Sequence, residues 1–309
     1  AWTRAWRLRP RRVAPPPKMS PTAFRSYLEC PFRFYLRHVL KMEAVDPEKR
    51  ELDALDFGTL CHAPLEKLAE ETWRDCTDEH VLASMLVDEF DRVASERFGD
   101  APAVPLVAQL ESARQRLRWA ARVQARERAA GWVIVAKERP FQIEFGGVVI
   151  SGKIDRIDRH EQTGEWRVLD YKTTDKGKTP AEAHLGTVRD GIEAWAVTDA
   201  PGKPRMWIDL QLPLYLHALP LILPDVQGRA RAAYFNLPKA ATTTAVETWD
   251  DYTPGLHESA MKCAEAIVAA VRACRFWPPN EKIDPEYDVF AELFHRGVAE
   301  SIAWEEETS

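Results

Sequence analysis

Two acidic residues and one lysine within residues 152–174 have the types and spacing that could do chemistry. This stretch reads GKIDRIDRHEQTGEWRVLDYKTT, and its alternating segments on either side of a polar turn predict two antiparallel strands. We expect Asp155 near the end of the first strand and Asp170 near the end of the second. Side chains two apart in a strand share a face, so Asp170 and Lys172 point the same way. Tyr171 points away and leaves its backbone carbonyl facing the same site.

Two carboxylates and a carbonyl form an oxygen-rich set of ligands. A hard cation such as Mg²⁺ prefers these ligands and fills its remaining positions with water. Phosphodiester hydrolysis has a high barrier, and a bound metal lowers it by activating water and neutralising charge on the phosphate. Lys172 could hold the attacking water or a phosphate oxygen. A lone Asp-x-Lys is more often a surface ion pair, so this prediction needs support from other residues.

Two further patterns are expected on helices. GTLCH, residues 58–62, places His62 on a helix after a glycine. QLPLY, residues 211–215, places Gln211 and Tyr215 four apart and therefore on one helical face. Taken singly, His62 is more often a packed histidine, and Tyr215 is as often a core tyrosine with a satisfied hydroxyl. Their significance therefore depends on where the fold brings them.

The elements around these residues predict a mixed α/β domain. Apolar residues at helical spacing predict helices that begin after Ser20 and Pro31, and further helices over 58–74, 78–98 and 105–130. Period-two patterns then predict strands over 132–145, 147–158 and 166–172, with a Gly146–Gly147 hairpin turn between the first two. A helix over 205–219, a strand over 229–237 and a helix over 254–273 follow. This order predicts a helical N-terminal part and one central sheet flanked by helices.

Composition limits the classes of protein that the chain can be. Of its 309 residues 45% are hydrophobic and 29% charged, which is typical of a globular protein and excludes a disordered or fibrous one. No apolar run approaches the roughly 20 residues of a membrane helix, so we expect no membrane partner. The net charge of -6 is unusual for a protein that grips nucleic acid by charge alone. It is compatible with carboxylates that hold a cation.

The five cysteines lie far apart and form no C-x-x-C pair, which argues against a zinc ribbon or a disulfide scaffold. We therefore expect the chain to work in a reducing cytoplasm. Residues 1–18 combine arginines with a Pro15–Pro17 run, which predicts an extended basic linker or tail. Residues 1–18 lack the continuous apolar centre that is typical of a signal peptide. We expect the chain to be a piece of a longer protein.

Four of these patterns occur in the order that marks a known family. They are G-x-x-x-H at Gly58–His62, G-x-x-D at Gly152–Asp155, D-x-K at Asp170–Lys172 and Q-x-x-x-Y at Gln211–Tyr215. The sequence resembles the PD-(D/E)XK nuclease superfamily in its RecB-like branch. Residues 20–40, SPTAFRSYLECPFRFYLRHVL, are also similar to the entry helices of AddB-type nuclease domains. The resemblance runs from Ser20 to about Trp277.

This resemblance implies a restriction-endonuclease-like core over residues 19–309, with a helical insert at about 63–130. It also implies roles for the matching residues. His62, Asp155 and Asp170 would ligate the metal, with the Tyr171 carbonyl as a further ligand, and Lys172 would be the catalytic lysine. The metal would be Mg²⁺, for which Mn²⁺ can substitute.

Three more residues receive roles from the resemblance. Glu138, before the hairpin, would be an auxiliary acidic residue near the metal, although a solvated glutamate at a strand start is an equal alternative. Gln211 and Tyr215 would brace the site or contact DNA.

Many AddB-type domains also hold an iron-sulfur cluster with one cysteine before the nuclease core and three after it. Cys30 stands where the first would be, but only Cys263 and Cys274 follow the core. We expect no cluster. We expect Phe276 and Trp277 to pack against the entry helices instead and to close the structure there by apolar burial.

The function that follows is a magnesium-dependent deoxyribonuclease, with exonuclease favoured over endonuclease. It would be the C-terminal nuclease domain of a DNA repair helicase-nuclease, with DNA and a helicase domain or subunit as partners. Two alternatives stay open. One is a catalytically inactive nuclease fold that binds DNA or serves as a structural module, and the other is a stand-alone nuclease like those of CRISPR adaptation.

Overall fold

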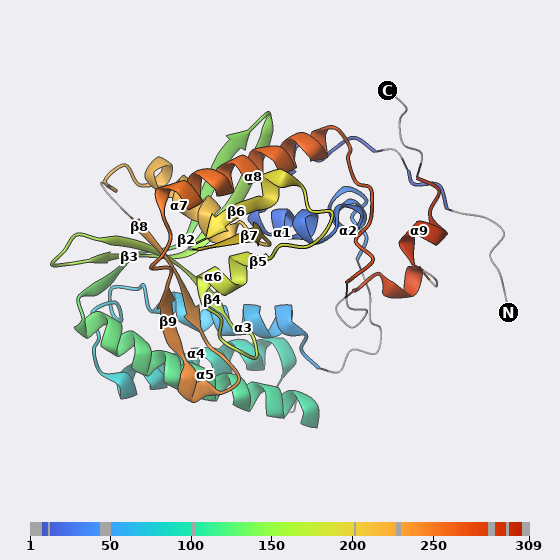
Figure 1. The fold of residues 1–309 in the computed structure, drawn as a ribbon. Coiled ribbons are helices and arrows are strands. Elements are labelled where there is room, and N and C mark those ends of the chain that lie inside the picture. Colours follow the sequence, from blue (N-terminus) through green and yellow to red (C-terminus); the bar gives the residue numbers. More distant parts are fainter. Residues whose placement is uncertain are drawn as a thin grey trace.

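A central sheet with helices on both faces forms the body of the molecule (Figure 1). The computed structural model describes residues 8–11, 13–43, 51–99, 103–200, 202–226, 230–283, 288–294 and 297–304. Within these ranges the central sheet is mixed and has six strands, and a separate antiparallel sheet has three. The protein is therefore a mixed α/β domain, as the sequence predicts.

The central sheet is built around a long antiparallel meander. Its strands are β1 (Lys18–Met19), β2 (Trp132–Phe145), β3 (Val148–His160), β4 (Trp166–Lys172), β8 (Ala230–Asn236) and β9 (Ala245–Thr248). Their order is β1-β3-β4-β8-β9, and β2 pairs with β3. The β1–β3 and β4–β8 pairs are parallel and the others are antiparallel. The β2–β3–β4 meander predicted from the sequence is thus confirmed.

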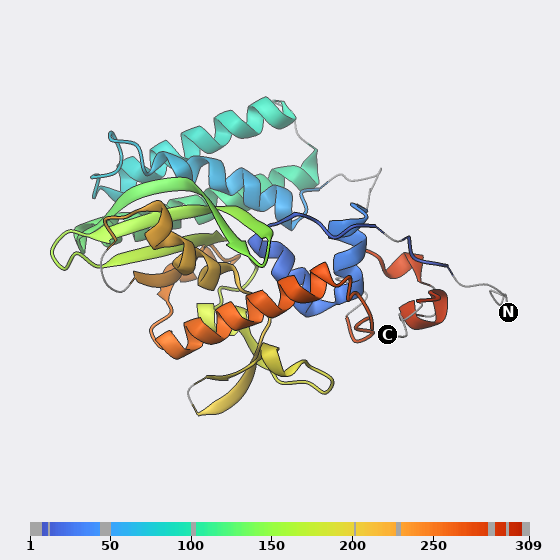
Figure 2. The same cartoon turned by 90° about the horizontal axis from the view of Figure 1, so that it is seen from above.

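Two helical layers cover the sheet, as both views show (Figures 1 and 2). One layer contains α1 (Pro21–Glu29), α2 (Pro31–Phe34), a π-helical turn (Tyr35–Val39), α7 (Gln211–Ile222) and α8 (Pro254–Arg272). The other contains α3 (Ala54–Lys67), α4 (Glu79–Phe98) and α5 (Val104–Ala129). Among the described residues, no helix is long and apolar enough to cross a membrane.

The smaller sheet contains β5 (Leu185–Thr187), β6 (Val197–Ala200) and β7 (Lys203–Trp207) in the order β5-β7-β6. Its yellow strands project beyond α8 in the view from above (Figure 2). The short helices are α6 (Pro180–His184), α9 (Val298–Ser301) and the 3-10 turns Ala194–Ala196, Ala241–Thr243 and Ala291–Leu293.

The central parallel pair is buried on both faces. Along β4, Val168 packs in the core under α7 and α8, whereas Leu169 and Tyr171 pack in the core under α3 to α5. Along β8, Tyr234 and Phe235 divide between the two cores in the same way. Because successive side chains in a strand face opposite ways, an apolar run at these positions fills both cores at once.

Several element predictions are wrong at their boundaries. The helix expected over 205–219 begins only at Gln211, and residues 203–207 are strand β7. Pro213 is compatible with the helix because it lies in the first turn, where backbone N–H groups have no intrahelical acceptor. The helix expected over 58–74 spans Ala54–Lys67 and is followed by turns. Strand β9 and the smaller sheet were not predicted from the sequence.

The two ends of the described chain pair with each other, and the N-terminal segment also contacts the central sheet. Leu8 forms a parallel bridge with Ile302, and the Pro17 carbonyl accepts a hydrogen bond of 3.1 Å from the Val149 N–H. Residues 1–7 and 12 of the segment expected to be a linker lie outside the described residues.

The packing expected of Phe276 and Trp277 against the entry helices is confirmed. The rings of Phe276 and Phe34 stack with centroids 5.9 Å apart, and Trp277 meets Phe32 edge-on at 5.8 Å.

Candidate active site

Asp155 and Asp170 come together where the β3–β4 ladder ends. The last registered pair is Arg156 with Leu169, so the next residues along the two strands are Asp155 and Asp170. The carboxylate of Asp155 accepts a 3.0 Å hydrogen bond from the Tyr171 N–H. Asp155 lies within β3 rather than near its end, because β3 continues to His160. The two carboxylates nevertheless converge as predicted.

Lys172 and Asp170 share a face, and they contact each other. Lys172 Nζ lies 2.7 Å from Asp170 Oδ2 and donates a 2.9 Å hydrogen bond to Gln211 Oε1. The Gln211 amide in turn donates a 2.9 Å hydrogen bond to the Tyr215 hydroxyl. Lys172, Gln211 and Tyr215 are therefore linked by a chain of two hydrogen bonds.

His62 reaches the same site from α3. Its Nε2 lies 3.2 Å from the Tyr171 carbonyl oxygen, and its Nδ1 lies 3.8 Å from Asp155 Oδ2. Because a carbonyl can only accept a hydrogen bond, Nε2 carries the proton in this contact and Nδ1 keeps its lone pair. The free lone pair thus belongs to the nitrogen nearer Asp155, and the Tyr171 carbonyl orients the ring.

Glu138 completes a compact set of possible metal ligands. Ligand atoms of His62, Glu138 and Asp155 all lie within 4.8 Å of one another, and this is the one such group among the described residues. Glu138 stands across from Asp155 in the β2–β3 ladder, between the Lys137–Arg156 and Arg139–Ile154 pairs.

The backbone of Glu138 is strained. Its φ is 44°, in the left-handed region that non-glycine residues seldom adopt and that is stable only where neighbours enforce it. Its carboxylate also lies 3.3 Å from Lys153 Nζ. The strain occurs where β2 aims an acidic side chain at the group.

The charges of the site are poorly neutralised. Burial, followed by the repulsion of Asp170, raises the pKa of Asp155 to about 8. Burial acts to lower the pKa of Lys172, but the carboxylates of Asp170, Asp209 and Asp155 outweigh it and the pKa is raised. Lys172 therefore stays protonated at neutral pH, and its one positive charge is shared by the carboxylates of Asp170, Asp155 and Asp209.

The sequence of most of the chain matches the model of a known protein family. The model described as the PD-(D/E)XK nuclease superfamily matches residues 18–286. The chain belongs to the PD-(D/E)XK nuclease superfamily.

Three relatives of this superfamily member are each named as a subunit of an ATP-dependent helicase/deoxyribonuclease. The protein of Moorella thermoacetica is 27% identical over 70% of this chain, that of Leuconostoc mesenteroides 26% over 58%, and that of Clostridium acetobutylicum 25% over 65%. The matched regions cover 19%, 16% and 17% of these relatives, so the chain spans less than one fifth of their length.

Two glycines of the superfamily motifs stand where elements approach closely. A Cβ on Gly58 would lie 3.3 Å from Thr173 Oγ1, just beyond the end of β4. A Cβ on Gly152 would lie 3.1 Å from both Phe141 and Pro21. Gly58 therefore lets α3 bring His62 to the strand that carries Asp170, and Gly152 lets α1 approach β3.

A buried arginine that was not predicted from the sequence supports the site strands. Arg116 of α5 donates a 2.8 Å hydrogen bond to the Thr173 carbonyl and one of 3.1 Å to the Leu237 carbonyl. It thereby ties the chain segments after β4 and β8 to the helical layer. Its position among alanines and arginines of a long helix gave no signal of this role.

The Cys30 thiol lies where α2 contacts the C-terminal segment. The Cys30 sulfur accepts hydrogen bonds from the Asn280 N–H at 3.2 Å and from Arg33 at 3.4 Å. Cys263 is buried in α8 and Cys274 is exposed. Arg33 also forms an ion pair with Asp288. Hydrogen bonds and this ion pair thus connect α2 to the C-terminal segment.

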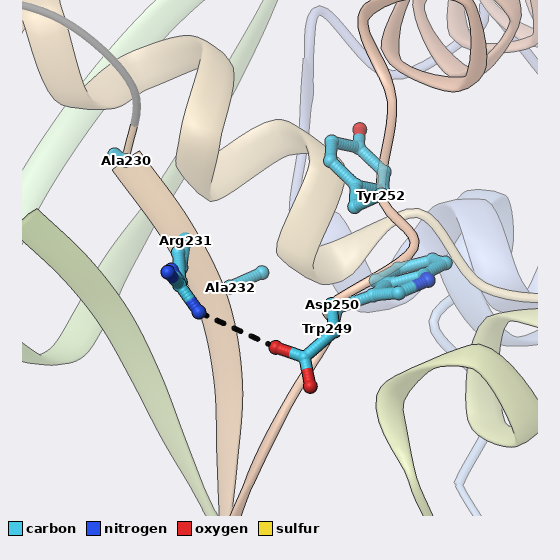
Figure 3. Close-up of a pocket in the computed structure, with 6 residues that line it drawn as sticks. All are labelled: Ala230, Arg231, Ala232, Trp249, Asp250 and Tyr252. Carbon is cyan, nitrogen blue, oxygen red and sulfur yellow. Dashed lines mark hydrogen bonds and ion pairs between the residues drawn. The ribbon is translucent and has the colours of Figure 1, made fainter.

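A cavity of about 240 Å³ lies elsewhere on the central sheet. Its lining residues are Ala230, Arg231, Ala232, Trp249, Asp250 and Tyr252 (Figure 3). Ala230 pairs with Trp166 at the start of β4, whereas Asp170 pairs with Tyr234 near its end. The cavity and the candidate site are therefore at different ends of the β4–β8 pair.

Proposed function

We propose that this chain is a magnesium-dependent deoxyribonuclease domain in which His62, Asp155 and Asp170 bind the metal. The observation that carries the proposal is the convergence of Asp155 with Glu138, His62 and Asp170 at the end of the β3–β4 ladder. An imidazole and several carboxylates are a suitable set of ligands for a divalent cation, either Mg²⁺ or Mn²⁺ in its place. Superfamily membership supports the same chemistry.

The residues around the ion have distinct roles in this proposal. Bound Mg²⁺ would activate water and neutralise charge on the phosphate. Asp155 and the Nδ1 atom of His62 would hold the ion, and the Tyr171 carbonyl would orient His62 or be a further ligand. Glu138 serves as the auxiliary acid.

Lys172 is the catalytic lysine of the proposal. Its ammonium group has a hydrogen bond from Nζ to Gln211 and an ion pair with Asp170, which fix its position. It can donate a remaining hydrogen to a phosphate oxygen or to the attacking water.

The biological setting is proposed from the relatives. They are named as subunits of an ATP-dependent helicase/deoxyribonuclease, and we propose that this chain acts on DNA beside a helicase domain or subunit, as an exonuclease. Residues 19–309 would form the nuclease domain, with the helices of about 63–130 as its insert and residues 1–18 as the joint to the remainder. The scattered free cysteines favour a reducing cytoplasm.

Cleavage assays test the proposal directly. We expect linear duplex DNA to be degraded with Mg²⁺ or Mn²⁺ and to be left intact with a chelator, and we expect a covalently closed circle to be spared. Asp170→Asn should lower the rate about a thousandfold and Lys172→Ala at least about a hundredfold, with folding retained in both. Lys262→Ala, in an exposed ion pair on α8, is the control that should leave the rate unchanged. Full cleavage by both site variants would refute the assignment.

A further inference from the structure

Two buried polar side chains support the start of α7 from outside the helix. Asp209 is 6% exposed, and its Oδ1 accepts a 2.8 Å hydrogen bond from the Gln211 N–H. His184 is fully buried, and its Nε2 lies 3.2 Å from the Leu212 nitrogen. These are the first two N–H groups of α7, which have no acceptor within the helix. Asp209 and His184 therefore supply a cap that the helix lacks by itself.

The position of His184 also fixes its tautomer. Because Nε2 accepts the Leu212 N–H, the ring proton is on Nδ1, which donates to the Pro180 carbonyl at 2.9 Å. The Tyr234 hydroxyl is 3.3 Å from the same nitrogen. The imidazole thus connects α6 to α7, and the Asp209 carboxylate faces the positive end of the α7 dipole.

The first turn of α7 carries the residue that holds Lys172. Gln211 accepts from Lys172 Nζ through Oε1 at 2.9 Å and donates to Tyr215 through Nε2 at 2.9 Å. If the Gln211 amide were rotated by half a turn, its NH₂ group would face the Lys172 ammonium group, and two donors would meet. The Gln211 amide therefore has one orientation. The position of the lysine amine is therefore coupled to the position of the first turn.

We propose that Asp209 and His184 are positioning residues for the cleavage reaction, which act by holding the first turn of α7 and, through Gln211, the amine of Lys172. This inference rests on the proposed nuclease function. In this proposal Asp209 and His184 contact neither DNA nor metal. They act only on the position of the Lys172 amine.

Four variants test this inference in matched pairs. Asp209→Ala and His184→Phe remove the acceptors, whereas Asp209→Asn and His184→Gln keep an oxygen that can accept the same N–H groups. Single-turnover cleavage with Mn²⁺ should fall about 10- to 100-fold in the first pair and stay within about threefold of the parent in the second. The Kd values for DNA and Mn²⁺ should change by less than about threefold in all four. Thr253→Ala, which removes the cap of α8, is the control that should lower the unfolding midpoint and leave the rate unchanged.

A double-mutant cycle tests whether the effect passes through Gln211. In a Gln211→Ala background, Asp209→Ala should lower the single-turnover cleavage rate by less than about threefold, because the connection to Lys172 is already lost. Multiplicative losses would overturn the inference, as would parental rates in Asp209→Ala and His184→Phe. If Asp209→Ala and His184→Phe do not fold, the folded Asp209→Asn protein is the test. A loss of tenfold or more in its cleavage rate would overturn the inference, and a retained rate would support it.

Amide exchange separates failure of this inference from failure of the proposed function. Exchange of the Gln211 and Leu212 N–H groups should accelerate at least about tenfold in Asp209→Ala and His184→Phe relative to their conservative partners. This measurement needs no activity. A parent protein that never cuts DNA would refute the nuclease proposal, whereas unchanged exchange at these amides would refute the cap itself.

Discussion

Asp155 and Asp158 lie three residues apart on β3, and their surroundings differ completely. Asp158 is fully buried and accepts hydrogen bonds of 2.6 and 2.9 Å from Arg156 and of 3.0 and 2.8 Å from Arg167. Among the described residues no arginine or lysine forms an ion pair with Asp155, which faces Asp170 and Glu138.

We propose that this difference separates a structural carboxylate, Asp158, from a metal-binding one, Asp155. The Asp158 cluster continues through Gln124, which accepts from Arg156 at 2.6 Å, and Glu127, which pairs with Arg167 at 2.6 Å, so it connects α5 to the sheet. Its charges are balanced within the protein. The carboxylates at Asp155 are not balanced, and such an arrangement is typical of a site that a cation completes.

The largest effect on stability is expected for Asp158→Asn. The substitution leaves two guanidinium groups buried against a neutral amide, so the free energy of unfolding should fall by about 3–5 kcal/mol. Chemical denaturation measures it, with Asp155→Asn as the matched control on the same strand. Equal stability of Asp158→Asn and the parent would show that the cluster is not structural.

Asp155→Asn should have the opposite effect in the absence of divalent ions. The pKa of Asp155 is about 8 in the folded protein and near 4 in an unfolded chain, so its contribution to stability is fully present below about pH 4 and is lost as the pH rises to about 8. The amide does not titrate. The variant should therefore match the parent at about pH 4 and exceed it by up to about 4 kcal/mol at pH 7, measured in a chelator.

Saturating Mn²⁺ should reverse the order of the two proteins in the same experiment, because only the parent keeps the full ligand set. If Asp155→Asn were less stable than the parent in chelator at pH 7, Asp155 would resemble Asp158 and the comparison would fail.

His62→Ala should weaken metal binding more than it weakens the fold. The side chain is 28% exposed, so its removal leaves little cavity, whereas the loss of one ligand should lower Mn²⁺ affinity at least about tenfold, or about 1.4 kcal/mol. Calorimetric titration measures the affinity, and thermal unfolding in chelator should show less than about 1 kcal/mol of change. Unchanged affinity for Mn²⁺ would remove His62 from the ligand set.

Gly58→Ala should have the smallest effect on stability. The new methyl group would press on Thr173 Oγ1 at 3.3 Å, while alanine favours the helix by about 1 kcal/mol, so the two contributions nearly cancel. The displacement of α3 from β4 should nonetheless slow cleavage several-fold, because His62 depends on this approach. A parental cleavage rate would show that the site tolerates the shift.

Local patterns were sufficient to predict most of the fold. The hairpin at Gly146 and Gly147 follows from residues that accept positive φ, here 52° and 81°, and the two long strands follow from their alternation. The smaller sheet was missed because its strands span only three to five residues, too few for a period of two to stand out, although β6 and β7 form a local hairpin. Residues 205–207 were assigned to the helix that follows for the same reason: a short strand end next to a real helix has no distinct period.

Some features of the candidate site were likewise predictable from local patterns, and others were not. Asp155, Asp170 and Lys172 were predictable because strand geometry converts their spacing into a shared face. The left-handed backbone of Glu138 and the cap formed by Asp209 and His184 were not, because they depend on register and on side chains brought together from separate segments. The G-x-x-D motif singles out Asp155 on β3, but no local pattern predicted that Arg156 and Arg167 would enclose Asp158.

Anomalous diffraction from crystals soaked in Mn²⁺ would show whether a cation completes the unbalanced carboxylates of β3. We expect a peak within coordination distance of Asp155, Asp170 and the Nδ1 atom of His62, beside Glu138, and none at Asp158. A site that stays empty at saturating Mn²⁺, or an ion bound only elsewhere on the molecule, would refute the assignment of these residues as metal ligands.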